Sequence, residues 1–495
     1  MTGGPGSPAG LSGNSGNGSP AGSAKANTAA PSNRRPRRRT GRGAELWLLI
    51  FAAIIVTAAL MIVELNQHQA LKIELVYYGG GYLAVFAIAH VVVRALAPYA
   101  DPLMLPLVAL LNGLGLVMIY RLDLAEAAKH ANATPQAPLQ LLWTAVSLVL
   151  FLVTLLVIRD HTSLQSYPYT LAFAGLIFLA LPAALPRSLS EVNGAKIWIR
   201  IPGLLSVQPS EFAKITLIVF AAAFLVSKRG VLSTAGPRFL GLTLPRIRDL
   251  GPLVALLAVS LGVLVVSNDL GPALLIFGVL LAMVYLATSR VSWLIIGLLA
   301  FAGGAVLAYQ FVPHLRVRVD IWLHPFADPQ GASYQLVQSL FGLGTGGIFG
   351  TGLGAGRPDI VPYASTDFIT AALGEELGLV GLTAIIVCFM ILVGRGMRAA
   401  LAARDNFGSL LAAGLSFSIG LQVFVIIGGV TGLIPLTGLT TPFVSYGGSS
   451  LLANYIILAL LLRISDSSRR PPVKQPRRTG TLAQARTEIL SRSAK

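Results

Sequence analysis

Long apolar runs separated by short polar segments dominate the chain from about residue 44 onward. A membrane-spanning helix needs roughly twenty apolar residues. By that criterion the pattern predicts about twelve helices, near residues 46–64, 75–97, 103–120, 139–158, 168–186, 209–227, 250–267, 270–288, 291–312, 368–394, 408–433 and 442–463. Lipid leaves helices or closed barrels as the only spanning structures, so we expect an all-α polytopic membrane protein.

The longest break in this pattern is the segment 313–366, rich in Gly, Pro and small polar residues. Long ordered loops are usually functional, and a carboxylate at the mouth of a membrane helix indicates a site. Asp367 holds that position. If the helix starts near Thr366, small residues share the face of Asp367 and could border a cavity: Ala371, Gly374 and Gly378.

The composition agrees with a membrane protein, because 54% of the residues are hydrophobic and only 12% are charged, against about 25% charged in soluble domains. The net charge of +17 lies largely in the two tails, so we expect no nucleic-acid partner. Basic residues beside membrane segments set orientation. The loop 228–249 and the turn 395–404 are basic, which predicts cytoplasmic termini and an outer location for 313–366.

The stretch from Gln208 to Lys214 carries the first candidate charges. Pro209 suits the first helical position, which places Glu211 in the first turn, where the helix dipole favours an anion. Glu211 and Lys214 are three residues apart and can pair on one helix face. This group is either an interfacial anchor or, together with the nearby Arg200, a cationic patch for an anionic head group.

Asp269 lies in a short turn between two predicted helices. It could cap the following helix or form a charged group with Lys214. Glu375 and Glu376 we interpret as partners of ion pairs inside the bundle.

The central loop offers two further features. Residues 334–340 predict a short amphipathic helix on the membrane surface, carrying Gln338 and Ser339. The glycine run 342–356 supplies backbone N–H groups that could approach a phosphate or a sugar, or it forms a flexible hinge. Later in the chain, Gly and Pro break two apolar segments, 428–438 and 441–450, which contains Ser445 and Ser449. Broken helices are tolerated where they line a cavity, so we expect a shared pocket.

Taken together, these motifs resemble the SEDS family (shape, elongation, division and sporulation), which includes RodA, FtsW and SpoVE. They are Gly194-Ala-Lys-x-Trp198-Ile, Gln208-Pro-Ser-Glu-Phe-Ala-Lys214, Asp269-Leu-Gly271, Tyr334-Gln-x-x-Gln-Ser339, Thr366-Asp-Phe-Ile369, Gly374-Glu-Glu-Leu-Gly-Leu-Val-Gly381 and Ser445-Tyr-Gly-Gly-Ser-Ser450.

The family pattern has about ten helices, so the first two helices here resemble the extra pair of actinobacterial RodA-type members. The domain division that follows is a disordered basic tail at 1–43, the extra pair at 44–100, the SEDS glycosyltransferase domain at 101–465 and a second basic tail at 466–495.

The resemblance implies a peptidoglycan glycosyltransferase that polymerises lipid II at the outer face of the bacterial plasma membrane during cell elongation, with a class B penicillin-binding protein as its transpeptidase partner. It implies that Asp367 is the catalytic residue. It places Glu211, Lys214 and Asp269 in the central cavity, and we add Arg200, Gln338, Ser339, Ser445 and Ser449 as candidate substrate-binding residues.

Two positions depart from the family pattern, because Tyr363 and Ser365 stand where many members have Glu and His. We expect Asp367 to be the base, and we rank Lys214 ahead of Arg200, Arg316 and Arg318 as the cation that neutralises the diphosphate. A divalent cation (Mg²⁺ or Mn²⁺) held by a carboxylate is the alternative; no other cofactor is expected. Three other functions stay open: a lipid II flippase, an FtsW-type division polymerase, and a scaffold that activates the penicillin-binding protein.

Overall fold

The computed structural model describes residues 41–68, 74–130, 132–192, 194–201, 205–232, 238–239, 242–243 and 250–471. The predicted tails at 1–43 and 466–495, apart from residues 41–43 and 466–471, lie outside these residues, as does most of the basic loop 228–249.

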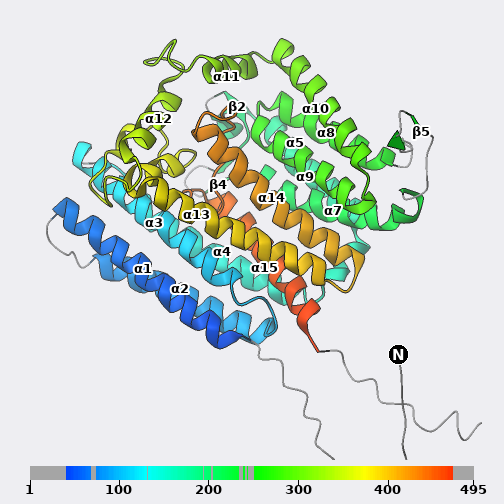
Figure 1. Ribbon diagram of the computed structural model, residues 1–495, viewed down its shortest axis with the longest axis horizontal. Coiled ribbons are helices and arrows are strands. Elements are labelled where there is room, and N and C mark those ends of the chain that lie inside the picture. The colour runs from blue at the N-terminus through cyan, green and yellow to red at the C-terminus, as the bar shows by residue number, and fades with distance from the viewer. Residues whose placement is uncertain are drawn as a thin grey trace, which may run out of the picture. The chain divides into compact units, whose positions relative to one another are not determined.

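Helices make up most of the described chain (Figure 1). The α-helices are α1 (Arg42–His68), α2 (Glu74–Leu96), α3 (Met104–Lys129), α4 (Ala137–Val157), α5 (Pro168–Ala184), α6 (Arg187–Ser190), α7 (Ser210–Leu232), α8 (Gly251–Val266), α9 (Leu270–Thr288), α10 (Val291–Phe311), α11 (Pro313–Leu323), α12 (Tyr334–Gly346), α13 (Ile369–Ala402), α14 (Asn406–Val430) and α15 (Gly448–Arg469). Two 3-10 helices are η1 (His161–Ser166) and η3 (Pro358–Ile360).

Three small antiparallel hairpins complete the described elements. They pair β1 (Glu191–Val192) with β2 (Ala195–Lys196), β3 (Ile199–Ile201) with β4 (Leu205–Val207), and β5 (Arg238–Phe239) with β6 (Leu242–Thr243).

All twelve predicted apolar segments form helices. Ten helices in the described residues are long and apolar enough to cross a membrane, whereas α5 and α8 are shorter apolar helices. The prediction of a polytopic all-α membrane protein is confirmed, and the count of twelve spans stays a prediction for these two.

The start of α13 differs from the prediction. The helix begins at Ile369, after Phe368 at its N-cap, so Asp367 precedes the helix. Gly378 then interrupts α13 with a φ of 68°. The expected alignment of Ala371, Gly374 and Gly378 on the face of Asp367 was therefore wrong, because it assumed one regular helix from residue 366.

The glycine run explains this interruption. The backbone N–H groups of Thr351 and Gly352 donate to the carbonyl oxygens of Glu375 and Glu376, both at 3.0 Å. A Cβ atom on Gly378 would lie 2.2 Å from the backbone N of Gly350. Around Gly346 and Gly350 the run is thus packed backbone to backbone against α13, which explains glycine at these two positions by close packing. The interpretation of the run as a phosphate cradle or a hinge stays a prediction.

The predicted surface helix is present as α12. It packs against α13, and several of its residues are buried, among them Leu336 and Ser339. It is therefore part of the helix packing. The first two helices form a pair in which α1 packs against α3 and α2 against α4 (Figure 1). At the end of α1, Asn66 Nδ2 donates to the carbonyl of Leu353 at 2.6 Å, so the pair also contacts the glycine run.

Candidate active site

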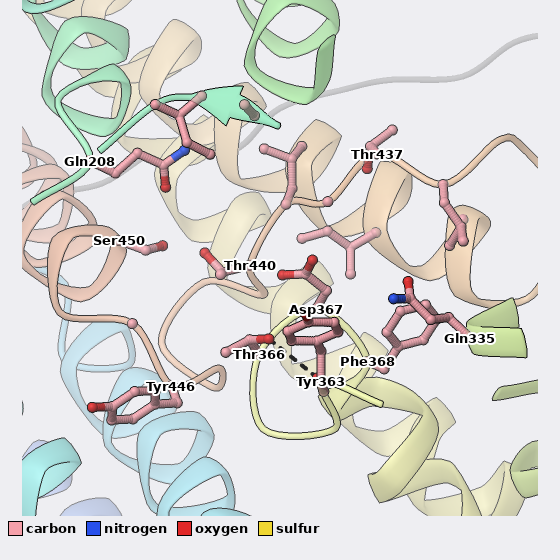
Figure 2. Close-up of a pocket in the computed structure, with 18 of the residues that line it drawn as sticks. Gln208, Gln335, Tyr363, Thr366, Asp367, Phe368, Thr437, Thr440, Tyr446 and Ser450 are labelled. Atoms are coloured by element: carbon pink, nitrogen blue, oxygen red, sulfur yellow. Dashed lines mark hydrogen bonds between the residues drawn. The ribbon is translucent and has the colours of Figure 1, made fainter. Parts of the chain in front are cut away.

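A cavity of about 770 Å³ opens at one end of the helices. Residues at or near the starts of α4, α7, α13 and α15 line it, together with the end of α14 and one face of α11. Its polar lining includes Ser206, Gln208, His314, Arg318, Gln335, Tyr363, Thr366, Asp367, Thr437, Thr440, Tyr446, Ser449 and Ser450. Figure 2 shows Asp367 in the middle of this lining, with Thr440 and Thr437 around it.

Asp367 is held by the backbone of a tight turn. The N–H groups of Thr366 and Phe368 both donate to the carbonyl of Tyr363, at 3.0 and 3.2 Å. Tyr363 itself has a positive φ of 55°. The hydroxyl of Ser445 donates to the carbonyl of Thr366 at 2.6 Å, which ties the turn to the segment before α15. The aspartate is therefore fixed on both sides by backbone contacts.

Arg318 of α11 is the cation beside Asp367. A Cβ atom on Gly438 would lie 3.6 Å from Nη2 of Arg318 and 3.8 Å from Oδ2 of Asp367, so both groups flank this glycine. Arg318 Nη1 donates to the carbonyl of Leu436 at 3.0 Å. Burial raises the pKa of Asp367 to about 6, and the positive charge of Arg318 offsets part of that rise.

Glu211 and Lys214 form a second charged group, which is buried and does not line the cavity. Lys214 is 3% exposed, and its Nζ lies 2.9 Å from both Glu211 Oε2 and Gln422 Oε1. Gln422 Nε2 donates to the carbonyl of Thr440 at 2.8 Å, and Thr440 lines the cavity. Lys214 therefore reaches the cavity wall through Gln422, and two of its three donors are engaged inside the bundle by Glu211 and Gln422.

Asp269 adjoins this group, as the sequence suggested, but its contact is with Ser210, whose hydroxyl donates to Oδ2 at 3.4 Å. Burial, and next the negative charge of Glu211, raise the pKa of Asp269 to about 7. Its side chain makes no cap hydrogen bond to α9. Among the described residues, no ion pair joins Asp269 to Lys214.

The other predicted binding residues lie in different parts of the structure. Ser449 lines the cavity and accepts from the N–H of Gln208 at 2.8 Å, and Ser445 supports the Asp367 turn. Arg200 is exposed on β3. The buried Ser339 donates to the carbonyl of Val430 at 3.0 Å, and Gln338 lines a second, smaller cavity. Asp367 and Ser449 are thus the members of the predicted set that line the main cavity, and the shared pocket expected from the two broken segments is present.

His314 and Gln335 line the cavity although neither was predicted to do so, and Arg318, predicted to rank below Lys214, lines it as well. The signal was available for α11: Pro313 at the first helical position puts His314 and Arg318 four residues apart on one face. Burial and the nearby charge of Arg318 lower the pKa of His314.

The two glutamates of α13 have different partners. Glu376 pairs with Arg121 at 3.0 Å, which confirms the predicted ion pair inside the bundle. Glu375 accepts a hydrogen bond from the backbone N–H of Arg357 at 2.7 Å. It has no ion-pair partner within the described part of the chain.

The donor set does not favour a metal centre. Among the residues that the structure describes, no group of three or more His, Cys, Asp or Glu side chains is close enough to hold a metal ion. Asp367 has a guanidinium as its charged neighbour. We therefore derive no step through a metal.

The chain is a helical membrane protein with one carboxylate and one guanidinium in a cavity at the helix ends. Known proteins with similar sequences identify its family. The sequence model of the FtsW/RodA/SpoVE family of cell cycle proteins matches residues 102–470. The chain belongs to this family.

Several relatives are similar over nearly the whole chain. Peptidoglycan glycosyltransferase RodA of Mycobacterium tuberculosis strain H37Rv is 56% identical over 463 residues, covering 94% of this chain and 98% of the relative. RodA of Mycobacterium leprae is 53% identical over 457 residues, with 92% and 97% covered. A solved structure described as "Structural coordination of polymerization and crosslinking by a peptidoglycan synthase complex" aligns with a TM-score of 0.58 at 29% identity, covering 75% of this chain and 99% of that one.

Proposed function

We propose that this chain, a peptidoglycan glycosyltransferase of the elongation type, polymerises lipid II with Asp367 as its general base. One observation carries the proposal: a carboxylate with a raised pKa of about 6 stands beside a guanidinium in a cavity of about 770 Å³. A catalytic base works best when its pKa lies near the operating pH.

The reaction joins the 4-hydroxyl of an acceptor N-acetylglucosamine to C1 of a donor N-acetylmuramic acid. Asp367 takes the hydroxyl proton as the new C1–O bond forms, and the bond from C1 to the diphosphate oxygen breaks. The bonding electrons leave with undecaprenyl diphosphate. A positioned base contributes about 10²–10⁴ in rate.

Arg318 stabilises the diphosphate as it leaves. A guanidinium suits phosphate oxygens because its donors are planar and permanently charged. Helix N-termini also favour anions, and the residues at or near the starts of α7, α13 and α15 line the same cavity. We therefore place Arg318 ahead of Lys214 as the first candidate, because Arg318 lines the cavity, whereas Lys214 does not and is bound by Glu211 and Gln422.

The group formed by Glu211, Lys214 and Gln422 positions the cavity wall at Thr440. Its role is to hold this wall in place, without contact to the reacting atoms.

The setting of the reaction is the outer face of the bacterial plasma membrane, with both termini in the cytoplasm and the polyprenyl chains in lipid. The partner is a class B penicillin-binding protein. The similar solved structure supports such a partner, because it is a peptidoglycan synthase complex in which polymerization and crosslinking are coordinated.

The test is polymerisation of lipid II by the purified protein with its partner transpeptidase, run beside Asp367→Ala. We expect glycan strands from the wild type and none from a folded variant that still binds the partner. Equal polymer from both proteins would remove Asp367 as the base. If the wild type made no polymer but moved lipid II across vesicles, the flippase alternative would replace the enzyme.

A further inference from the structure

The segment 441–446, which precedes α15, holds the turn that carries Asp367. The hydroxyl of Ser445 donates to the carbonyl of Thr366 at 2.6 Å. The backbone N–H of the residue after Ser445 donates to the carbonyl of Ser365 at 2.8 Å. Because these two carbonyls directly precede the aspartate, the position of Asp367 depends on the position of this segment.

The segment is bent at Phe443, whose φ is 65°. A bulky residue rarely adopts a positive φ, and such a conformation persists only when its surroundings impose it. The ring of Phe443 is buried and meets the ring of Tyr455 edge-on, with centroids 5.6 Å apart. The carbonyl of Phe443 accepts a hydrogen bond from Nδ2 of Asn112 on α3 at 3.1 Å. Asn112 therefore binds the segment at the residue whose backbone is strained.

Asn112 is itself fixed by its surroundings. It is 1% exposed, and its Oδ1 accepts from the hydroxyl of Thr144 on α4 at 3.3 Å. Three residues further along α3, a Cβ atom on Gly115 would lie 2.1 Å from the carbonyl oxygen of Val444. Since α3 contacts the segment through both a side-chain hydrogen bond and its backbone, a shift of α3 would move the segment.

The extra helix pair contacts the same part of α3. The hydroxyl of Tyr82 on α2 donates to the carbonyl of Ala109 at 2.5 Å. A Cβ atom on Gly113 would lie 2.2 Å from Cγ2 of Val56 on α1. Ala109 and Gly113 are four residues apart and share one face of α3, next to the face that carries Asn112. The pair therefore sets the position of the turn of α3 from which Asn112 reaches the segment.

We propose that Asn112 is a positioning residue for Asp367, which acts through the segment 441–446, and that the α1–α2 pair holds α3 in place for this role. The inference rests on the proposed function, because it takes Asp367 as the base. Asn112 does not line the main cavity, so its effect on the reaction passes through the turn that carries Asp367. Displacing a reacting group by about 1 Å can cost about 10²-fold in rate.

The experiment is a double-mutant cycle on lipid II polymerisation by the full-length protein with its partner transpeptidase. It compares the wild type, Asn112→Leu, Asp367→Asn and the double variant, with the enzyme in excess so that low rates are measured. Leucine keeps the size of the side chain and removes its hydrogen bonds. We expect Asn112→Leu to lower kcat about tenfold at unchanged KM in the wild type. In the Asp367→Asn background we expect less than about a twofold change, because residues that act as a unit are not additive.

The control and two further variants separate positioning from stability. Thr154→Val removes a buried hydroxyl of α4 that bonds to Leu150 in the same helix at 2.8 Å, and it should leave the rate unchanged. Asn112→Ser guards against misfolding of the leucine variant, because a helical serine can bond within its own helix and still loses the contact with Phe443. Tyr82→Phe should give a loss of about twofold to threefold that also disappears in the Asp367→Asn background.

An equal loss from Asn112→Leu and Asn112→Ser in both backgrounds would overturn the proposal, because it would indicate a structural role alone. An unchanged rate in either folded variant would overturn it as well. An unchanged rate for Tyr82→Phe would remove the helix pair from the account. If Asp367→Asn polymerised lipid II as fast as the wild type, the assignment of the base under the proposed function would fail instead.

Discussion

Two charged groups lie at the same end of this molecule, and they differ in what surrounds them. Lys214 and Glu211 are paired with each other, and Gln422 engages Lys214 as well. Asp367 and Arg318 flank Gly438 in an open cavity, with space beside them for a substrate. Both groups contain residues that sequence motifs singled out or placed as candidates. The comparison shows how two charged groups can be told apart. A pair whose partners lie inside the bundle stabilises the fold, whereas a pair that faces an open cavity is available for catalysis.

Substitutions of Asp367 and Asp269, whose pKa values are both raised, test this comparison most directly. Asp367→Asn should reduce kcat about 10²–10⁴-fold, because the base is lost while the shape of the side chain is kept. Asp269→Asn should retain most of the activity, since Asp269 is hydrogen-bonded to Ser210. Glycan-strand assays on both variants, matched by thermal unfolding, check this. A larger loss from Asp269→Asn would assign the chemistry to the other group.

Arg318→Gln should lower kcat about 10²–10³-fold, because the leaving diphosphate loses its cation, while the melting temperature changes little. Lys228→Gln, an exposed cation on α7, is the matched control and should leave the rate unchanged. If the rate were insensitive to Arg318 but sensitive to Lys214 in a protein of normal stability, the assignment of the two cations would be reversed.

Lys214→Met should act mainly on stability, lowering the free energy of unfolding by about 3–5 kcal/mol, because Glu211 stays buried without its partner. The double variant Lys214→Met with Glu211→Leu should recover much of this loss, since replacing both partners of a buried pair is often close to neutral. Thermal unfolding in detergent measures both. If the double variant did not recover stability, the pair would have a role beyond stabilising the helix bundle.

Much of the fold could be predicted, because twenty-residue apolar runs have few alternatives in a bilayer. Asp367 could also be placed at a helix mouth from its position after the loop. The break in α13 at Gly378 could not, since a positive φ inside a long apolar run depends on the backbone of Gly350 packing against it. Lys214 was ranked over Arg318 because that ranking also depended on a distant contact. Gln422, which binds Lys214, is 208 residues away in the chain, and local spacing does not reveal such a partner.

The pH dependence of kcat/KM tests the central claim most directly. A base must be deprotonated to act, so the rate should rise with pH, bend near the pKa of Asp367 at about 6 and level off above it. The residual activity of Arg318→Gln should bend at a higher pH, because the positive charge of Arg318 lowers the pKa of Asp367. A bend near 3.8, the ordinary value for an aspartate, would contradict the account. So would a bend near 7 that moves to lower pH in Glu211→Gln, since the negative charge of Glu211 raises the pKa of Asp269, and such a result would identify Asp269 as the titrating base.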